Sequence, residues 1–403
     1  MQRTPPCPRC PLTRSVFFAT GFRPFFLLAA AFAVLSMGVW SLALVGVFPH
    51  TFALPGVAWH AHEMIWGFTV AVIAGFLLTA ARNWTGLETA SGPALAGLVA
   101  LWVAGRVVLF FGAALPWWVV AAVDVSFLPA LAWGIGRPLH QAKSERNFVF
   151  PVLLVILALA NLAIHLEAAG VVGPVGPSAR LVALDAIAWM MLLMGGRIVP
   201  MFTRNALPHA QVKTLPRVDE LALASMAVLL ALDVGMLGLP WLATAAAVAA
   251  LIAGVLNGLR MVGWGTGATL RHPILWVLHL GFAWVPIALV LRGLSVFEPA
   301  AIPATLGTHA LAVGGIGTLT LGMMSRVALG HTGRPLRVGR WIAGAYLLVT
   351  LAVFVRLGAA LGPPGAVLSG WVASGVLFAL AFGIYLVLYT PILLAPRADG
   401  RPG

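Results

Sequence analysis

The sequence predicts an all-α fold, a polytopic membrane helix bundle of about twelve transmembrane helices with both termini in the cytoplasm. Three observations predict it. The chain is 61% hydrophobic and only 9% charged, whereas soluble proteins carry roughly 25% charged residues. Apolar windows of about 20 residues, the length that crosses a bilayer, recur along the whole chain. The lysines and arginines gather in alternate loops between these windows.

Together these apolar windows cover most of the chain and leave only short gaps. They cover residues 22–46, 58–81, 93–113, 116–136, 148–168, 178–200, 219–238, 241–261, 271–294, 302–328, 337–359 and 366–394. Proline and glycine stand in the gaps, as expected for helix boundaries. The longest loop, 203–218, has only about 16 residues. We therefore expect a flexible cytoplasmic tail over 1–17, one twelve-helix transmembrane domain over 18–396, and a cytoplasmic tail over 397–403.

The charges predict the orientation in the membrane. With a cytoplasmic N-terminus, eighteen lysines and arginines fall on the inner side and three on the outer side, namely Arg180, Arg292 and Arg356. Positive residues accumulate in cytoplasmic loops, so both termini are predicted to be cytoplasmic. The formal net charge of +13 is then explained by topology, and no nucleic-acid partner is expected.

The two cysteines, Cys7 and Cys10, form a Cys-x-x-Cys pair in the N-terminal tail. A tetrahedral zinc site takes four ligands, which two thiols alone cannot supply. The sequence assigns this pair no role.

Histidines at or inside the apolar windows are the main functional signal. The second window begins at Trp59-His60-Ala61-His62-Glu63-Met64, and residues two apart on a helix point about 200° apart. One helix could thus offer a ligand to two neighbours. His279 and His309 lie in the ninth and tenth windows, roughly 8 Å apart in depth at 1.5 Å per residue. They therefore serve different centres, unless one window boundary is misplaced.

Ionisable residues within membrane spans are functional candidates by default, and imidazole is the commonest metal ligand. The alternative is that each histidine only hydrogen-bonds a neighbouring helix. As a set, His60, His62, His279 and His309 are predicted to ligate haem or a metal. Haem is favoured over a single metal ion because aromatic and small residues follow the first pair, namely Trp59, Trp66, Phe68, Gly67 and Gly75. His165, which closes the fifth window, is not selected.

The sequence predicts less specific roles for the other charged residues. Glu63 could orient an imidazole or pass a proton. Arg106 and Asp124 are predicted to pair with each other, because an isolated charge in a membrane is costly, while Asp185 and Asp233 stay unassigned. Two inner-boundary arginines could hold propionates or another anion, or could simply anchor the cytoplasmic face; these are Arg197 and Arg326.

These segments together resemble the NnrS family, the haem- and copper-containing membrane proteins linked to the bacterial nitric oxide response. The resemblance rests on Gly21-Phe22-Arg23-Pro24-Phe25-Phe26, the His-Ala-His-Glu-Met segment, Gly-Arg-x-x-Pro-x-Phe-Thr-Arg-Asn from Gly196, His279 with Trp284-Val285-Pro286, and His309 to Gly333-Arg334-Pro335. It implies about twelve helices, one or two haem b groups, copper as a further candidate, and a role in tolerating nitric oxide. It does not supply an agreed reaction or ligand set.

The chain is also similar in outline to haem–copper oxidases and nitric oxide reductases, which carry haem ligands on their second and tenth helices. Those enzymes place a copper cluster of histidines on the sixth and seventh helices. Here neither window contains a histidine, which puts an oxidase-like binuclear centre in doubt.

The leading hypothesis is a haem protein of the bacterial inner membrane that binds or turns over nitric oxide, with a quinol or a cytochrome as candidate electron donor. Two alternatives stay open. One is a twelve-helix transporter without haem, and the other is a non-catalytic haem sensor or electron carrier. Whether the protein is an enzyme is left undecided by the sequence.

Overall fold

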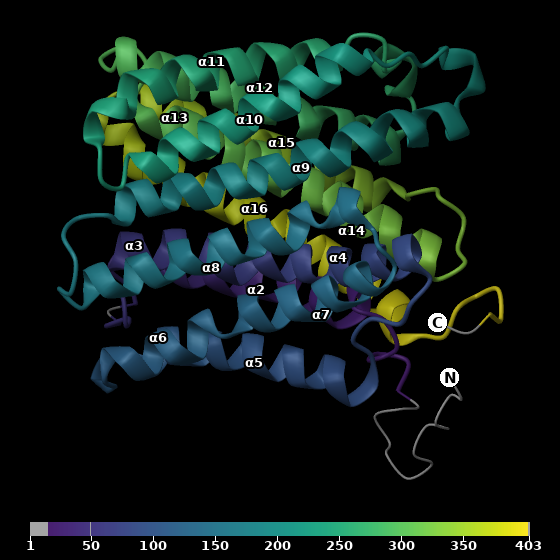
Figure 1. The fold of residues 1–403 in the computed structure, drawn as a ribbon, viewed down its shortest axis with the longest axis horizontal. Coiled ribbons are helices and arrows are strands. Elements are labelled where there is room, and N and C mark those ends of the chain that lie inside the picture. The colour runs from purple at the N-terminus through teal and green to yellow at the C-terminus, as the bar shows by residue number, and fades with distance from the viewer. Residues whose placement is uncertain (1–14, 49, 402–403) are drawn as a thin grey trace.

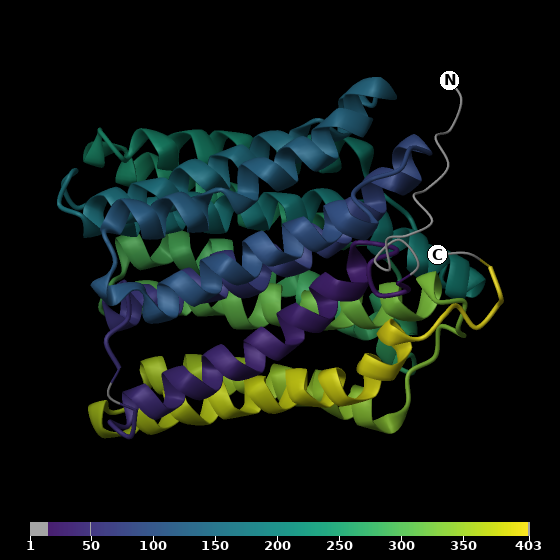
Figure 2. The same cartoon turned by 90° about the horizontal axis from the view of Figure 1, so that it is seen from below.

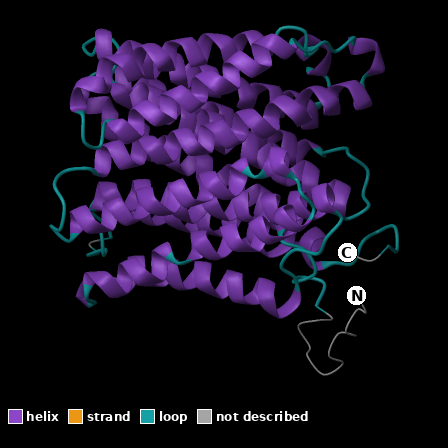
Figure 3. Cartoon of the chain, viewed as in Figure 1, coloured by secondary structure: helices purple, strands orange, loops and turns teal. Residues whose placement is uncertain are grey.

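The computed structural model describes residues 15–48 and 50–401. Within these ranges the chain folds into helices and connecting loops, without a strand (Figure 3). The helices lie roughly parallel and antiparallel along one common axis (Figures 1 and 2). The predicted all-α fold is confirmed.

Twelve helical segments of membrane-spanning scale occur in the described residues. Six are single helices in the first and middle parts of the chain: α2 (Phe22–Leu44), α5 (Gly92–Phe111), α8 (Val149–Ala168), α9 (Gly176–Ala206), α10 (Pro216–Gly235) and α11 (Ala243–Arg260). Three more follow them: α12 (Pro273–Phe297), α15 (Arg340–Leu361) and α16 (Pro364–Leu394). The other three spans are composite, comprising α6 (Trp117–Val125) with α7 (Phe127–Gln141), α3 (Gly56–His62) with η1 (Glu63–Thr69) and α4 (Val70–Thr85), and α13 (Ala304–His309) with η7 (Ala310–Gly317) and α14 (Thr318–His331).

Eleven of these segments are long and apolar enough to cross a membrane. The twelfth is α10, which carries three carboxylates and one arginine: Asp219, Glu220, Asp233 and Arg217. Two of these acids pair with arginines of neighbouring helices, so their charge is compensated inside the bundle. The expected number of about twelve helices is therefore confirmed, although one of them is unusually charged.

Proline sets several helix starts. Pro93, Pro273 and Pro364 occupy the first turn of α5, α12 and α16, where the missing N–H would have no helical partner anyway. Pro55 and Pro303 precede α3 and α13 in the same way. These prolines explain why the windows read from the sequence and the observed helices agree to within several residues.

The two ends of the described chain lie at the same end of the bundle, on the right in Figure 1. Arg23, at the start of α2, donates to the carbonyl oxygens of Leu393 and Ala395, both at 2.7 Å, at the end of α16. The side of the membrane that this end faces follows only from the charge pattern and stays a prediction. Most of the 1–17 tail, including Cys7 and Cys10, lies outside the described residues.

Two spans contain a π-helical stretch, and each stretch starts directly after a histidine. η1 follows His62 and η7 follows His309. The two spans, 56–85 and 304–331, are also the most enclosed, each with 83% of its apolar window buried, against 72% for the next. Single π-helical turns inside α-helices occur frequently at functional sites. Both stretches lie toward the end of the bundle opposite the termini.

The wider π turn of η1 frees backbone carbonyls, and side chains satisfy them. Thr69 donates its hydroxyl to the carbonyl of Met64 at 2.7 Å, and the indole of Trp102 donates to the carbonyl of Gly67 at 3.1 Å. Unpaired carbonyls are costly in a membrane interior. The irregular turn is therefore supported by its own side chains and by α5.

Candidate functional site

His60 and His62 face different surroundings, as their spacing predicts. His60 lines a cavity of about 480 Å³ between the two π-containing spans, α2, α9, α15 and α16. His62 is fully buried and contacts Asn161 and Asp124 on the other side of its helix. One helix thus borders two separate sites, a mainly apolar cavity and a buried polar cluster.

The cavity brings His60 together with His309, which also lines it. Its walls are otherwise mainly apolar, with aromatic and small side chains at Trp40, Phe68, Phe378, Ala61, Ala312 and Gly375. Ligand and cofactor pockets typically have about 300–1,000 Å³ and such a lining with a few convergent polar groups. The volume and lining therefore fit a large apolar ligand.

The imidazole of His309 is held in one tautomer. Nδ1 lies 2.8 Å from the carbonyl oxygen of Thr305, to which it donates. Nε2 lies 2.9 Å from a guanidinium nitrogen of Arg356, from which it accepts. A histidine that ligates a metal usually donates its other ring N–H to a carbonyl or carboxylate. His309 has this arrangement, with Arg356 in contact with the nitrogen that would bind.

His60 is held by stacking rather than by hydrogen bonds. Its ring lies flat on Trp40, with centroids 4.7 Å apart and planes 8° apart. Its nitrogens make no hydrogen bond with another described residue. Two thioethers, Met37 and Met64, line the same cavity. The cavity thus contains one imidazole whose nitrogens are available to bind a metal, and two thioether sulfurs that are further potential ligands.

Two arginines also line the cavity, Arg180 and Arg356. Besides its bond to His309, Arg356 lies over the ring of Trp371 at 4.5 Å. Its other terminal nitrogen is buried and has no hydrogen-bond partner among the described residues. A buried guanidinium with unused donors is suited to a carboxylate, which it binds in bidentate fashion.

The residues that line this cavity would fit a haem. They offer two imidazoles as iron ligands, aromatic and small side chains to pack against the ring, and two guanidinium groups to pair with propionates. The described residues contain no cysteine, and both cysteines of the chain are in the 1–14 segment. A haem here would be held without thioether links, as haem b is.

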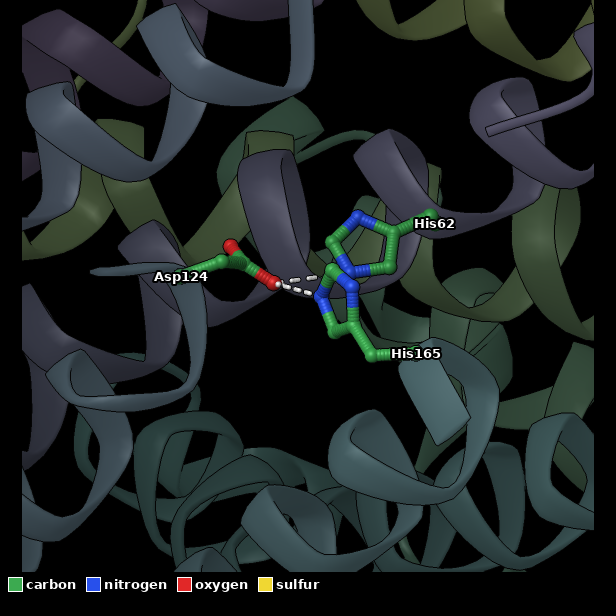
Figure 4. A group of neighbouring side chains, drawn as sticks. All are labelled: His62, Asp124 and His165. Carbon is green, nitrogen blue, oxygen red and sulfur yellow. Dashed lines mark hydrogen bonds and ion pairs between the residues drawn. The ribbon is translucent and has the colours of Figure 1, made fainter. Parts of the chain in front are cut away.

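His62 belongs to a second site, a buried polar cluster of His62, Asp124, Asn161 and His165. Figure 4 shows both imidazoles directed at the same carboxylate oxygen of Asp124. Each Nε2 lies 3.0 Å from Asp124 Oδ2. Asn161 donates to that oxygen at 2.7 Å and accepts from His62 Nε2 at 2.7 Å. All four side chains are at most 4% exposed.

Glu63 and Arg106 extend this cluster. The guanidinium of Arg106 pairs with Glu63 through one nitrogen and with Asp124 through another. The predicted Arg106–Asp124 pair is therefore confirmed, with Glu63 as a further partner. Gly67 permits the approach, because a Cβ at that position would lie 2.6 Å from Glu63 Oε2.

His279 does not join either site. Its Nε2 lies 2.8 Å from the hydroxyl of Thr203 and its Nδ1 lies 2.9 Å from the hydroxyl of Thr266. Both ring nitrogens are therefore occupied, at the end of the bundle that carries the termini. The predicted separation of His279 from His309 agrees with this placement, and its role as a ligand stays a prediction.

The inner-boundary arginines also lie away from the cavity. Arg197 donates to Asn147 at 2.9 Å, and Arg326 lies 3.8 Å from the ring centre of Phe202. The arginines that accompany His60 and His309 are Arg180 and Arg356 instead.

Sequence reasoning missed four residues of these sites: His165, Asn161, Arg180 and Arg356. It placed the two arginines and His165 at the outer face. Because that face carries few charged residues, each of them could have been selected as a candidate. Asp185 and Asp233, left unassigned by the sequence, both bind Arg292, at 2.7 Å and 2.5 Å.

A second cavity of about 90 Å³ lies farther along the same elements, and its lining is almost wholly apolar. Val72 and Ile73 follow Phe68 and Thr69 of the first cavity by one turn on the same span. Leu319 follows Ile316 in the same way on the other. The two cavities therefore lie one after the other along the two π-containing spans, and α2 and α9 line both of them as well.

Comparison with known proteins agrees with the resemblance read from the sequence. A search of curated proteins found no match. The family model described as NnrS protein matches residues 16–397. Because this match covers nearly the whole chain, the protein belongs to the NnrS family.

Proposed function

We propose that this multi-pass membrane protein binds haem b in the His60–His309 cavity and acts in the nitric oxide response of the bacterial inner membrane. One observation carries the proposal. The two most buried spans each place a histidine on one shared cavity, which two arginines also line. Family membership supports the same reading.

When bound, haem would supply an iron that coordinates nitric oxide. The side chains of the cavity would bind and orient the haem. His309, with Nδ1 held by the Thr305 carbonyl, keeps Nε2 directed into the cavity. His60, stacked on Trp40, would supply the second imidazole that holds the haem or would stand beside the bound nitric oxide. Arg356 would leave His309 and pair with a propionate, with Arg180 as the second anchor.

The apolar second cavity supports a small uncharged ligand. Nitric oxide is diatomic and neutral, so it enters membrane interiors without a polar route. The 90 Å³ cavity has room for it but not for a solvated anion, because its lining offers almost no polar surface. We propose that nitric oxide reaches the haem cavity from this side, along the spans of η1 and η7.

Glu63 is proposed to assist the His60–His309 cavity without lining it. It is buried, it does not line the cavity, and one of its carboxylate oxygens has no hydrogen-bond partner among the described residues. Such an oxygen could hold a proton next to the haem helix. If the protein turns over nitric oxide as an oxidoreductase, protons and electrons are both required, the latter from a quinol or a cytochrome.

The test is the optical spectrum of the purified protein. We expect a Soret band in protein expressed with haem supply, and its loss in His60→Gln and His309→Gln. His140→Gln is the matched control, since that exposed histidine lies at the end of α7 and lines neither cavity, and it should keep the full band.

Absence of a Soret band from the wild-type protein would overturn the haem proposal and favour a transporter. Full retention of the band in the His60 and His309 variants would overturn the assignment of ligands. Nitric oxide consumption with an electron donor separates an enzyme from a sensor or electron carrier.

A further inference from the structure

We infer that Asp185, Asp233 and Arg292 form a proton-binding site, in which two buried carboxyl groups share one exchangeable proton. The site joins three spans, because Asp185 lies on α9, Asp233 on α10 and Arg292 on α12. None of the three residues lines the haem cavity or belongs to the His62–Asp124 cluster. Proton binding at this site therefore does not depend on haem binding.

One guanidinium serves both carboxyl groups. Arg292 Nη1 donates to the two carboxylate oxygens of Asp185 at 2.8 Å and 2.7 Å, and Nη2 donates to Asp233 Oδ1 at 2.5 Å. Asp185 is 2% exposed and Asp233 is 1% exposed, whereas the side chain of Arg292 is 18% exposed. The two acids are thus enclosed, and the arginine is the member of the group that reaches the surface.

The charges of this group do not cancel without a proton. Two carboxylates at −1 and one guanidinium at +1 leave a net charge of −1, and an isolated charge inside a membrane is costly. One proton brings the net charge to zero. A divalent metal ion would only reverse its sign. When two carboxyl groups share a site in this way, one of them keeps its proton.

The hydrogen bonds indicate where the proton fits. Asp233 Oδ2 is buried and has no hydrogen-bond partner among the described residues, while the other three carboxylate oxygens accept from Arg292. The two carboxyl groups also lie within hydrogen-bond reach of each other. Ionised carboxylates only accept hydrogen bonds, so a bond between these groups requires a proton on one of them. The proton belongs to the pair, which titrates as a unit.

The other titratable groups on the neighbouring helices do not replace this proton. The charged groups that act on Asp185 are Arg292 and Asp233. Several groups near this end of the bundle have other contacts in the described structure: Arg180 at the haem cavity, His165 with Asp124, Glu167 with Gly176, His309 with Arg356, and Arg260 of α11 with Asp219. The remaining ones on α9, α10 and α12 lie toward the opposite ends of these helices, namely Arg197, Arg204, Arg217, Asp219, Glu220 and His279.

The site adjoins one wall of the haem cavity. Leu184, the neighbour of Asp185 on α9, lines that cavity, and so does Thr308 on α13. Gly307 packs against the backbone of Arg292, because a Cβ at that position would lie 2.8 Å from Arg292 N. A proton held here would be close to a reaction that consumes protons in the cavity. That use of the proton rests on the proposed function, whereas its binding does not.

The experiment records infrared spectra of the purified full-length protein at neutral pH, in H₂O and in D₂O. The C=O stretch of a protonated carboxyl group is separate from the bands of carboxylates and backbone amides. We expect the wild type to show this band and to shift it in D₂O, because the proton is exchangeable. Asp185→Asn and Asp233→Asn should each lose one carboxyl equivalent of the band, since Arg292 then balances the single carboxylate that remains.

Arg292→Gln should change the band in the opposite direction. Two buried acids without their cation would both be protonated, so the band should gain one carboxyl equivalent. Glu220→Gln is the matched control, because Glu220 is an exposed acid on the same helix as Asp233, and it should leave the band unchanged. Elution as a single species in size exclusion and a cooperative melting transition check that each variant is folded.

Identical bands in the wild type and both aspartate variants would overturn the inference. A melting temperature that then depends on sodium would identify a monovalent metal ion in place of the proton. Loss of the band in only one of the two aspartate variants would also overturn it, because the proton would then belong to a single carboxyl group. A Soret band is measured on the same samples, so that failure of the haem proposal is recorded separately.

Discussion

His60 and His62 are two residues apart on one helix and belong to different sites. His60 stacks on Trp40 and lines the cavity shared with His309, whereas His62 contacts Asp124 and Asn161. The helix that carries both residues therefore separates the two sites and presents one histidine to each of them. The π turn that begins at Glu63 changes the register of the helix directly after this pair.

Arg356 is predicted to anchor the haem. Arg356→Gln removes the guanidinium beside His309, and a charge-assisted hydrogen bond is worth about 1.5–3 kcal/mol. We expect haem retention to fall about tenfold or more, measured as haem per polypeptide after dialysis against a haem acceptor. Arg401→Gln is the control, because that side chain is 79% exposed. Equal haem retention in both variants would contradict a propionate role for Arg356.

Gly67 is predicted to tolerate no side chain. A Cβ in Gly67→Ala would lie 2.6 Å from Glu63 Oε2 and would also meet Phe32 and Arg106. Overpacking of this kind costs about 1–3 kcal/mol, so the melting temperature in detergent should fall. Gly134→Ala, on α7 with nothing within 4 Å of its Cβ position, should leave it unchanged or raise it. A lower melting temperature in the Gly134 variant alone would refute this account.

Removal of Arg106 is expected to destabilise the protein more than removal of the Glu63 charge. Arg106→Gln leaves two buried carboxylates without their cation, and breaking a buried ion pair costs about 3–5 kcal/mol. Glu63→Gln keeps a polar partner for Arg106 and leaves one carboxylate against one guanidinium. Thermal unfolding of both variants tests the order. Equal losses would mean that the charge balance of the cluster does not control its stability.

The apolar cavity is predicted to admit nitric oxide. Leu319→Trp places a large ring in the 90 Å³ cavity and should slow nitric oxide association with the reduced haem while the Soret position stays the same. Flash photolysis measures the association rate. Leu347→Trp, on α15 and 61% exposed, is the matched control. An unchanged rate in the Leu319 variant would place the ligand route elsewhere.

The orientation of the bundle is predicted from its loop charges. In a background without Cys7 and Cys10, Thr214→Cys should react with a membrane-impermeant thiol reagent only in inverted vesicles. Ala300→Cys, an exposed position in the loop between α12 and α13, should react in intact cells after the outer membrane is permeabilised. The reverse pattern would invert the topology and contradict a cytoplasmic location for the termini.

Much of the fold was predictable because the membrane constrains it strongly. A span must be apolar, must satisfy its backbone and must be about 20 residues long. Those requirements are local, so windows of hydropathy located the helices, and prolines in the gaps, such as Pro93 and Pro116, marked some of their starts. The acid-rich α10 was also found as an apolar window, although its carboxylates are compensated only by arginines on other helices.

The sequence by itself determined the helical class, the number of spans and the opposed directions of His60 and His62, because these depend on composition and on helical periodicity. Only the tertiary structure decided which residues meet. It paired His60 with His309 and Arg356, joined His62 to Asp124 and His165, and left His279 between two threonines. The physical reason is that partners on different helices are chosen by packing across the bundle, which no local pattern along the chain records.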